Sequence, residues 1–174
     1  MSSSPIGADA VVPEPRDRLE RLRLLRLRLA ARGRLEVRGR VRVEPRVRIA
    51  VAPGARVVLE DGCLLGAGCR IEAAQGTVRI GAGAQLGARA LLVALAGIDV
   101  GAGCTVGEWA VIADHEPTYE DSERPTRLQP LRTAAVRLGD GARVGAHAAL
   151  TAGATVAPGE VVGSYETRAP RSAP

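Results

Sequence analysis

The sequence predicts an all-β chain that folds as a left-handed parallel β-helix, a solenoid of short strands stacked coil upon coil. Three observations support this prediction. An aliphatic residue recurs every six positions, a small residue holds a fixed place in each period, and aromatic side chains are rare, with one Trp, two Tyr and no Phe among 174 residues. A core without large rings has to be built from many similar layers of Val, Leu, Ile and Ala.

The six-residue period stays in register over eleven units. Each unit begins with an aliphatic residue, commonly continues with Gly, and has a small residue in the fifth place. Such a period suits a short strand followed by a tight turn, with the aliphatic side chain pointing inward. Three units make one triangular coil of about 18 residues, and coils stack at roughly 4.8 Å. The units are LEDGCL (59–64), LGAGCR (65–70), IEAAQG (71–76), IGAGAQ (80–85), LGARAL (86–91), VGAGCT (100–105), VGEWAV (106–111), LGDGAR (138–143), VGAHAA (144–149), LTAGAT (150–155) and VAPGEV (156–161).

The three cysteines occupy the fifth place of their units, where other units carry Ala. Cys63, Cys69 and Cys104 are therefore predicted to be small, inward-facing core residues. Their odd number and the absence of a CxxC motif argue against a disulfide framework and against a zinc site.

The solenoid domain is expected to span residues 34–168. Its first strands fall in residues 34–49, where aliphatic residues alternate with Arg and Glu. Residues 1–13 and 169–174, rich in Ser, Pro and Ala, are expected to be flexible tails. The inward residues of the alternating stretch are Leu35, Val37, Val41, Val43, Val47 and Ile49.

Segment 14–33 is predicted to form an N-terminal helix that caps the open end of the solenoid, where strand edges would otherwise be exposed. Leu24 and Leu27 do not lie on the helix face that the other leucines share. A helix on a membrane surface is the alternative, but the arginines are spread around the helix and do not gather on one side. The leucines that share a face are Leu19, Leu22, Leu25 and Leu29.

All 24 basic residues are Arg, and they are concentrated toward the N-terminus. Residues 1–56 contain 14 Arg and six acidic residues. This polarity fits either an anionic partner or arginines that simply fill solvated positions. No aromatic platform or nucleic-acid motif accompanies the charge, so we expect no nucleic-acid partner. No apolar run is long enough to cross a membrane, and the chain is expected to be cytoplasmic.

One long segment interrupts the repeat. The inward residues Ile112 and Leu138 lie 26 positions apart where the period requires six, so residues 113–137 are predicted to leave the solenoid as an inserted loop. A long excursion from a rigid repeat is a common place for function. Its polar and titratable residues are Asp114, His115, Glu116, Tyr119, Glu120, Asp121, Glu123, Arg124, Arg127 and Arg132.

Together with the repeat, the segment IADHEPTYEDSERPTRLQPLRTAAVRLGDGARVGAHAALTAGATV resembles the hexapeptide-repeat acyltransferases, in particular their sugar and polysaccharide O-acetyltransferase branch. The resemblance covers roughly residues 57–163. It implies a homotrimer in which acetyl-CoA lies between neighbouring solenoids and gives its acetyl group to a hydroxyl of a sugar or polysaccharide. It implies no metal.

The resemblance also implies roles for particular residues. A loop histidine acts as general base, which here assigns His115, with Asp114 as the carboxylate that orients its ring. Contacts with CoA fall on Gly145, Ala152 and Gly153. Arg143 is a candidate for a CoA phosphate, and an ordinary solvated turn residue is its alternative interpretation.

The sequence departs from the family pattern in the loop itself. The family's usual base is the histidine of Asp-x-Asp/Asn-His, and that place is taken here by Pro117, two residues after His115. A tryptophan that is frequent in the returning repeat is replaced by Arg143, and the chain ends as VVGSYETRAP. Two hypotheses follow. Either His115 acts in a shifted loop, or the protein is a catalytically inactive scaffold that retains the fold.

Two further residues stand in the fourth, outward place of their units. Trp109 is predicted to contact a neighbouring subunit or, alternatively, the pantetheine arm. His147 either borders the groove between subunits or has no chemical role. A carbonic anhydrase of this fold would need three histidines for its metal, and the chain has two. The sequence specifies neither the acceptor nor the length of the acyl chain.

Overall fold

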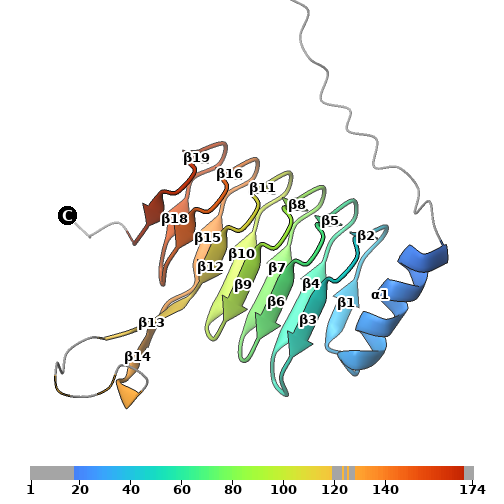
Figure 1. Ribbon diagram of the computed structural model, residues 1–174, viewed down its shortest axis with the longest axis horizontal. Helices are drawn as coiled ribbons and strands as arrows, with labels where there is room; N and C mark the ends of the chain where they lie inside the picture. The colour runs from blue at the N-terminus through green and yellow to red at the C-terminus, as the bar shows by residue number, and fades with distance from the viewer. Residues whose placement is uncertain (1–17, 119–122, 124, 126–127, 171–174) are drawn as a thin grey trace, which may run out of the picture.

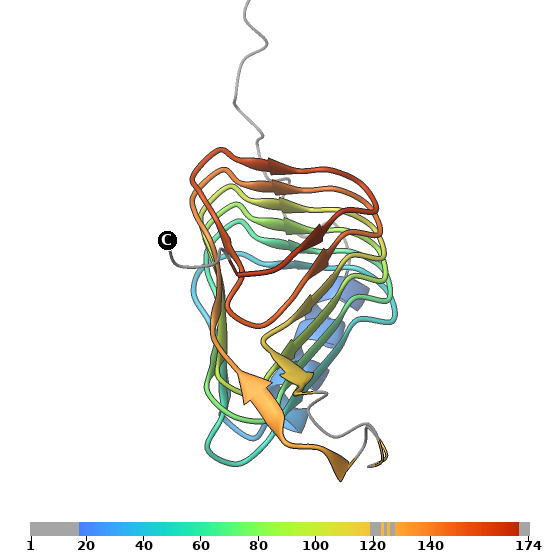
Figure 2. The same ribbon diagram turned by 90° about the vertical axis from the view of Figure 1, so that its left-hand side faces the viewer.

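The computed structural model describes residues 18–118, 123, 125 and 128–170. Three parallel six-stranded sheets, here called A, B and C, form the sides of a triangular solenoid (Figures 1 and 2). The chain passes from sheet A to B to C in every coil, and each strand pairs with the strand one coil further on. The predicted all-β solenoid is confirmed.

The strands recur in threes along the chain. Sheet A contains β1 (Leu35–Val37), β4 (Arg56–Leu59), β7 (Thr77–Ile80), β10 (Gly97–Val100), β15 (Val136–Leu138) and β18 (Thr155–Val156). Sheet B contains β2 (Arg42–Val43), β5 (Leu64–Leu65), β8 (Gln85–Leu86), β11 (Thr105–Val106), β16 (Arg143–Val144) and β19 (Val161–Val162). Sheet C contains β3 (Arg48–Val51), β6 (Arg70–Ala73), β9 (Leu91–Ala94), β12 (Val111–Ala113), β17 (Ala149–Leu150) and β20 (Thr167–Arg168).

The core is a set of aliphatic columns that run along the solenoid. In sheet A, Val57 pairs with Val78, which pairs with Ile98, so each inward residue stacks on the equivalent residue of the next coil. These side chains are fully buried or nearly so. The predicted core cysteines are confirmed, because all three thiols are free and completely buried. A residue that recurs at one place in each coil thus builds a continuous core without aromatic rings.

Helix α1 (Arg18–Ala30) lies within the predicted segment 14–33 and packs against the first coil, in contact with β1, β2 and β3 (Figure 1). Its docking face differs from the one that the leucine spacing indicates. Leu24 and Leu27 pack on the core, and the four leucines that share a face are exposed. Glu20 accepts a hydrogen bond from the Val43 amide, and this contact helps to fix the rotation of the helix. Residues 14–17 and the predicted tail 1–13 lie outside the described residues.

The inserted segment begins as a β-hairpin. Strand β13 (His115–Pro117) pairs antiparallel with β14 (Leu131–Thr133), and the hairpin projects from the edge of the solenoid between sheets C and A (Figure 2). The chain is back in sheet A by Val136, slightly before the expected end of the 113–137 insertion, because Val136 already pairs with Ile98. The candidate loop residues Tyr119, Glu120, Asp121, Arg124 and Arg127 lie outside the described residues, as does 171–174 of the predicted C-terminal tail.

The edges of the solenoid are tight turns, here named by the sheets they join. In the five later coils the AB corner places glycine at its one left-handed residue, namely Gly62, Gly83, Gly103, Gly141 and Gly159. At the BC corner the equivalent residues are Arg46, Gly68, Arg89, Trp109, His147 and Tyr165. The CA corner carries the hairpin. In the described part of the chain, no helix is both long and apolar enough to pass through a membrane.

Candidate active site

Asp114 lies at the CA corner, where the chain leaves β12 and enters the hairpin. Its side chain is completely buried, and it is the one buried charged residue among those the structure describes. The carboxylate accepts hydrogen bonds from three consecutive amides of the preceding coil, those of Leu95 (2.8 Å), Ala96 (2.7 Å) and Gly97 (2.6 Å). Amide donors that converge in this way compensate the loss of hydration that burial of a carboxylate costs.

The backbone around Asp114 closes the base of the hairpin. The Ala134 amide donates to the Asp114 carbonyl oxygen (2.9 Å), so the chain returns beside the point at which it left. The Gly153 amide of the next coil donates in turn to the Ala134 carbonyl (2.8 Å). Asp114 is thus held between the coil before it and the coil after it, and its carboxylate has little freedom to move.

His115 follows directly and pairs with this carboxylate. Its Nδ1 lies 3.3 Å from Asp114 Oδ1, and its side chain is 24% exposed. An ionised carboxylate only accepts hydrogen bonds, so this contact requires the proton on Nδ1. Nε2 then keeps its lone pair and is free to accept a proton. The structure therefore brings the two predicted catalytic residues together as an oriented pair.

The rest of the hairpin extends away from this pair. Glu116 forms an ion pair with Arg132 on the opposite strand, and Pro117 lies opposite Leu131. Because alternate residues of a strand face the same side, Pro117 and His115 share a face of the hairpin. Pro117 lies two residue pairs further along the hairpin than His115, about 7 Å along the strand.

The predicted CoA contacts are not gathered at one place. Gly153, at the CA corner, adopts a φ of +80° and lies beside Ala134, next to the Asp114 backbone. Ala152 is completely buried. Arg143 is an exposed residue of β16 in sheet B, the side of the triangle opposite the CA corner, so it does not join His115 within one molecule.

Gly145 belongs to the BC corner, away from the hairpin. A side chain there would collide with the backbone of Gly163 and Ser164 in the next coil. Coil packing is therefore sufficient to explain this glycine.

The BC corner carries a column of stacked side chains that sequence reasoning did not assemble. The His147 ring stacks on Tyr165 (centroids 4.9 Å apart) and faces Trp109 on its other side (6.1 Å). The Arg89 guanidinium lies 4.8 Å from the centre of the Trp109 ring. Trp109 is 48% exposed and Tyr165 77% exposed. The four residues share the fourth place of their units, and this was the sequence signal. They stack because equivalent positions of successive coils lie in register.

Three backbone amides are the other functional groups that sequence reasoning missed. The donors of Leu95, Ala96 and Gly97 precede Asp114 by 17 to 19 residues and carry no side-chain signature. Among the described residues, no group of three His, Cys, Asp or Glu side chains is arranged to hold a metal ion.

Comparison with known proteins gives one family match and several similar structures. Residues 77–108 match the model described as the hexapeptide repeat of succinyl-transferase. A search of curated proteins finds no match to this sequence.

Several of the similar structures are complexes of AntD, an N-acyltransferase from Bacillus cereus. A mutant with dTDP and coenzyme A has a TM-score of 0.67 and 16% identity, over 83% of this chain and 78% of that one. A second mutant with the same ligands has a TM-score of 0.56 and 17% identity, over 77% and 74%. AntD with dTDP and 3-hydroxybutyryl-CoA has a TM-score of 0.53 and 16% identity, over 87% and 80%. At this identity, the likeness shows that the fold is shared.

Proposed function

We propose that the protein transfers an acyl group from acyl-CoA to a hydroxyl of a sugar or polysaccharide, with His115 as the general base. The observation that carries this proposal is the Asp114–His115 pair, held rigidly where a single hairpin interrupts an otherwise regular solenoid. A buried carboxylate that orients a partly exposed imidazole is a standard arrangement for proton transfer. Acetyl-CoA, as predicted from the family resemblance, is the simplest donor.

The proposed transfer has two stages, addition of the acceptor to the thioester and then expulsion of CoA. Nε2 of His115 accepts the acceptor's hydroxyl proton while the oxygen attacks the thioester carbonyl, and a tetrahedral oxyanion forms. When this intermediate collapses, the C–S bond breaks, the imidazolium returns the proton to the CoA sulfur, and ester and CoA are released. Asp114 accepts the hydrogen bond from Nδ1–H and so keeps the ring in the tautomer whose Nε2 takes the proton.

The position of Pro117 supports the shifted base over a lost one. A histidine at 117 would share the face of His115 but would lie about 7 Å further along the strand from Asp114. His115 is the residue whose ring contacts the buried carboxylate. We therefore predict that Pro117→His does not restore activity to a His115→Ala protein.

The structural neighbours favour a second candidate acceptor, a sugar amine. AntD is an N-acyltransferase, and its complexes with dTDP and CoA or acyl-CoA have the same fold as this chain. An amine attacks in the same way and also has to lose a proton, so the Asp114–His115 pair serves either acceptor. Paired sugars that carry a hydroxyl or an amine at the same carbon distinguish the two candidates.

The first test needs no knowledge of the acceptor. Acetyl-CoA is titrated into the protein by calorimetry, and CoA release is then followed with panels of sugars and nucleotide sugars. We expect binding near one site per subunit, and His115→Ala should lower turnover by roughly 10²–10⁴-fold with little change in CoA affinity. His147→Ala, the other histidine, is the matched control and should retain activity.

Two outcomes would contradict the proposal. If millimolar acetyl-CoA produces no heat, the protein is the inactive scaffold. If His115→Ala keeps full turnover, the base has been assigned wrongly. A homotrimer is part of the proposal, supported by the exposed Trp109 on the solenoid surface, and a monomeric mass by light scattering would remove it.

A further inference from the structure

A groove crosses the outer face of sheet A over β7, β10 and β15. Thr77, Gly97 and Ala135 follow one another across it, and Arg79, Asp99 and Arg137 line its side. Gly97 has no side chain, so the surface between Thr77 and Ala135 is hollow at this point. Gly97 is extended with a φ of +152°, a conformation that L-residues rarely adopt, so the backbone itself favours glycine here.

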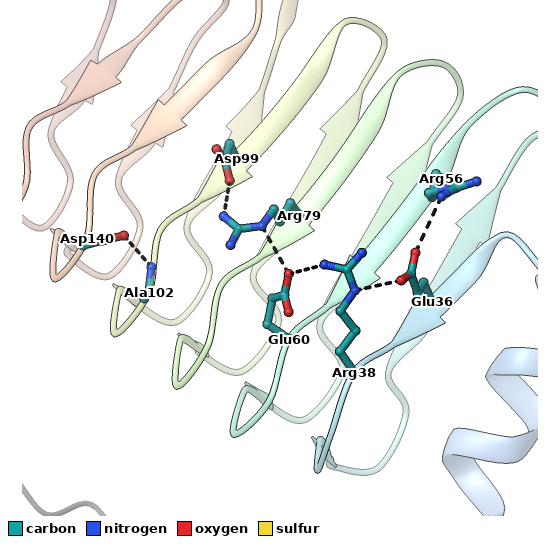
Figure 3. Close-up of polar contacts among 8 residues, drawn as sticks. All are labelled: Glu36, Arg38, Arg56, Glu60, Arg79, Asp99, Ala102 and Asp140. Carbon is teal, nitrogen blue, oxygen red and sulfur yellow. Dashed lines mark hydrogen bonds and ion pairs between the residues drawn. The ribbon is translucent and has the colours of Figure 1, made fainter.

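The rest of this face is a chain of ion pairs in which basic and acidic side chains alternate (Figure 3). Arg38 lies between Glu36 and Glu60, and Arg79 lies between Glu60 and Asp99, so each of these arginines contacts two carboxylates. From one end of the chain of contacts to the other, the N···O distances are Arg56–Glu36 (3.6 Å), Glu36–Arg38 (2.7 Å), Arg38–Glu60 (3.0 Å), Glu60–Arg79 (3.3 Å) and Arg79–Asp99 (3.2 Å).

Arg79, Asp99 and Arg137 are successive register partners in sheet A and form a column. Arg137 takes no part in the chain of ion pairs. It is the register partner of Asp99, yet its guanidinium forms no ion pair with any residue in the described part of the protein. On its other side the column continues with Thr155, where an alternating pattern would place an acid. Arg38 and Arg79 each have two carboxylate partners, whereas Arg137, at the end of the groove, has none among the described residues.

The groove also adjoins the Asp114–His115 pair. The Gly97 amide, in the groove floor, donates to the Asp114 carboxylate (2.6 Å). Ala135, at the opposite wall, follows Ala134, whose amide donates to the Asp114 carbonyl (2.9 Å). One hydrogen bond thus joins Gly97 of the groove to the carboxylate that contacts His115.

We propose that this groove is a binding site for a phosphate group, with Arg137 as its cation, and that it positions a substrate of the transfer reaction beside His115. The proposal rests on the proposed function. Phosphate is the anion that fits, because a planar guanidinium without a carboxylate partner binds phosphoryl oxygens in pairs, and CoA and nucleotide sugars both carry such groups. The phosphate belongs either to the acyl donor or to the acceptor.

Calorimetry with four probes separates these sources. The pairs are CoA with 3′-dephospho-CoA, and dTDP with thymidine, and each is titrated into the wild type and into Arg137→Gln. We expect Arg137→Gln to weaken one phosphate-bearing probe by about tenfold or more, without an equal loss for its less phosphorylated counterpart. Loss of dTDP affinity assigns the phosphate to the acceptor, and loss of CoA affinity assigns it to the donor.

Two further variants make the experiment specific. Arg48→Gln is the matched control, because Arg48 is likewise an exposed strand arginine without an ion pair in the described structure, but it lies in β3 of sheet C. It should bind all probes as the wild type does. Ala135→Leu fills the groove without changing charge and should weaken the same probe as Arg137→Gln. Thermal melts show that each variant is folded.

The proposal is overturned if a wild-type protein that binds and turns over acyl-CoA gives unchanged affinities for all four probes in Arg137→Gln. It is equally overturned if Arg48→Gln causes the same loss, since the effect would then be one of overall charge. If no probe binds the wild type, both this site and the acyltransferase proposal fail. Turnover therefore separates failure of the site from failure of the function.

Discussion

The AB and BC corners make the same backbone turn with different residues. At the AB corner the Gly103 amide donates to the Ala82 carbonyl of the preceding coil (2.8 Å), and at the BC corner the Trp109 amide donates to Ala88 in the same way (3.0 Å). Both residues are left-handed, with φ near +60°. In the five later coils the AB corner uses glycine throughout, but the BC corner uses it once.

The side chains of the BC corner are kept at an energetic cost. An L-residue in the left-handed region costs about 1 kcal/mol, and each ring or cation–π contact in the column contributes about 0.5–1.5 kcal/mol. Four strained residues (Arg89, Trp109, His147 and Tyr165) and the three contacts between them therefore nearly cancel. The column therefore adds little net stability, since glycine would serve the turn equally well.

The pH dependence of the free energy of unfolding shows whether the interiors behind the AB and BC turns are equally shielded from water. Burial raises the pKa of Cys63, behind an AB turn, and of Cys69, behind a BC turn, to about 12 from an ordinary value of 9.0. Below pH 9 both folded and unfolded thiols are protonated. As the pH rises from 9 toward 12, only the unfolded chain loses these protons, so the free energy of unfolding should fall by about 1 kcal/mol per pH unit for each thiol.

Urea unfolding at several pH values above 9 measures this slope. The Cys63→Ala and Cys69→Ala single variants should each lose an equal share of it. If only one of them changes the slope, the interiors of the two corners differ in their access to water.

Glycines that contact the next coil and glycines in open turns should respond differently to substitution by alanine. A methyl group added to Gly107 would lie 2.5 Å from the Ala146 backbone nitrogen of the next coil, so Gly107→Ala should lower the free energy of unfolding by about 3 kcal/mol. Gly103→Ala is the matched control. It meets no atom within 4 Å and incurs only the left-handed penalty, about 1 kcal/mol. Equal losses in denaturant titrations would mean that the coils separate easily at the Gly107 contact.

Substitution of the left-handed residues of the BC corner by glycine should change the free energy of unfolding least. Arg46 is strained and contacts no ring among the residues that the structure describes, so Arg46→Gly should stabilise the protein by about 0.5 kcal/mol. Trp109→Gly relieves the same strain but removes the contacts with Arg89 and His147, so it should destabilise by about 1 kcal/mol. Denaturant midpoints compare the two. The same sign for both variants would contradict the energy balance described above.

Much of the solenoid could be predicted from the sequence, because its period is set by coil geometry. An aliphatic residue every six positions can only line one interior, and Cys63, Cys69 and Cys104 follow from their fifth place. The docking of α1 could not be predicted in the same way. The shared face of Leu19 and Leu22 is exposed, because contacts with β1, β2 and β3 decide which side of the helix is buried.

The candidate site was predictable only in part. Asp114 and His115 are neighbours in sequence, so their pairing was foreseen, but the amides that hold Asp114 belong to another coil. Arg137 is one of 24 arginines, and nothing in its local sequence separates it from Arg79. Arg137 forms no ion pair with the described residues because Asp99 and Thr155 are its register partners across three coils, and Asp99 pairs with Arg79. Such information exists only once the coils are stacked.

The stacking of equivalent residues gives the outer surface a fixed unit of length. Neighbouring positions in a column, such as Arg137 and Thr155, are separated by one inter-strand distance of roughly 4.8 Å and point in the same direction. Exchanging these two residues would therefore translate a guanidinium by one step away from Asp114 without rotating it. The dependence of binding or turnover on the distance between charge and base becomes measurable in equal increments, a control of geometry that proteins with irregular surfaces do not offer.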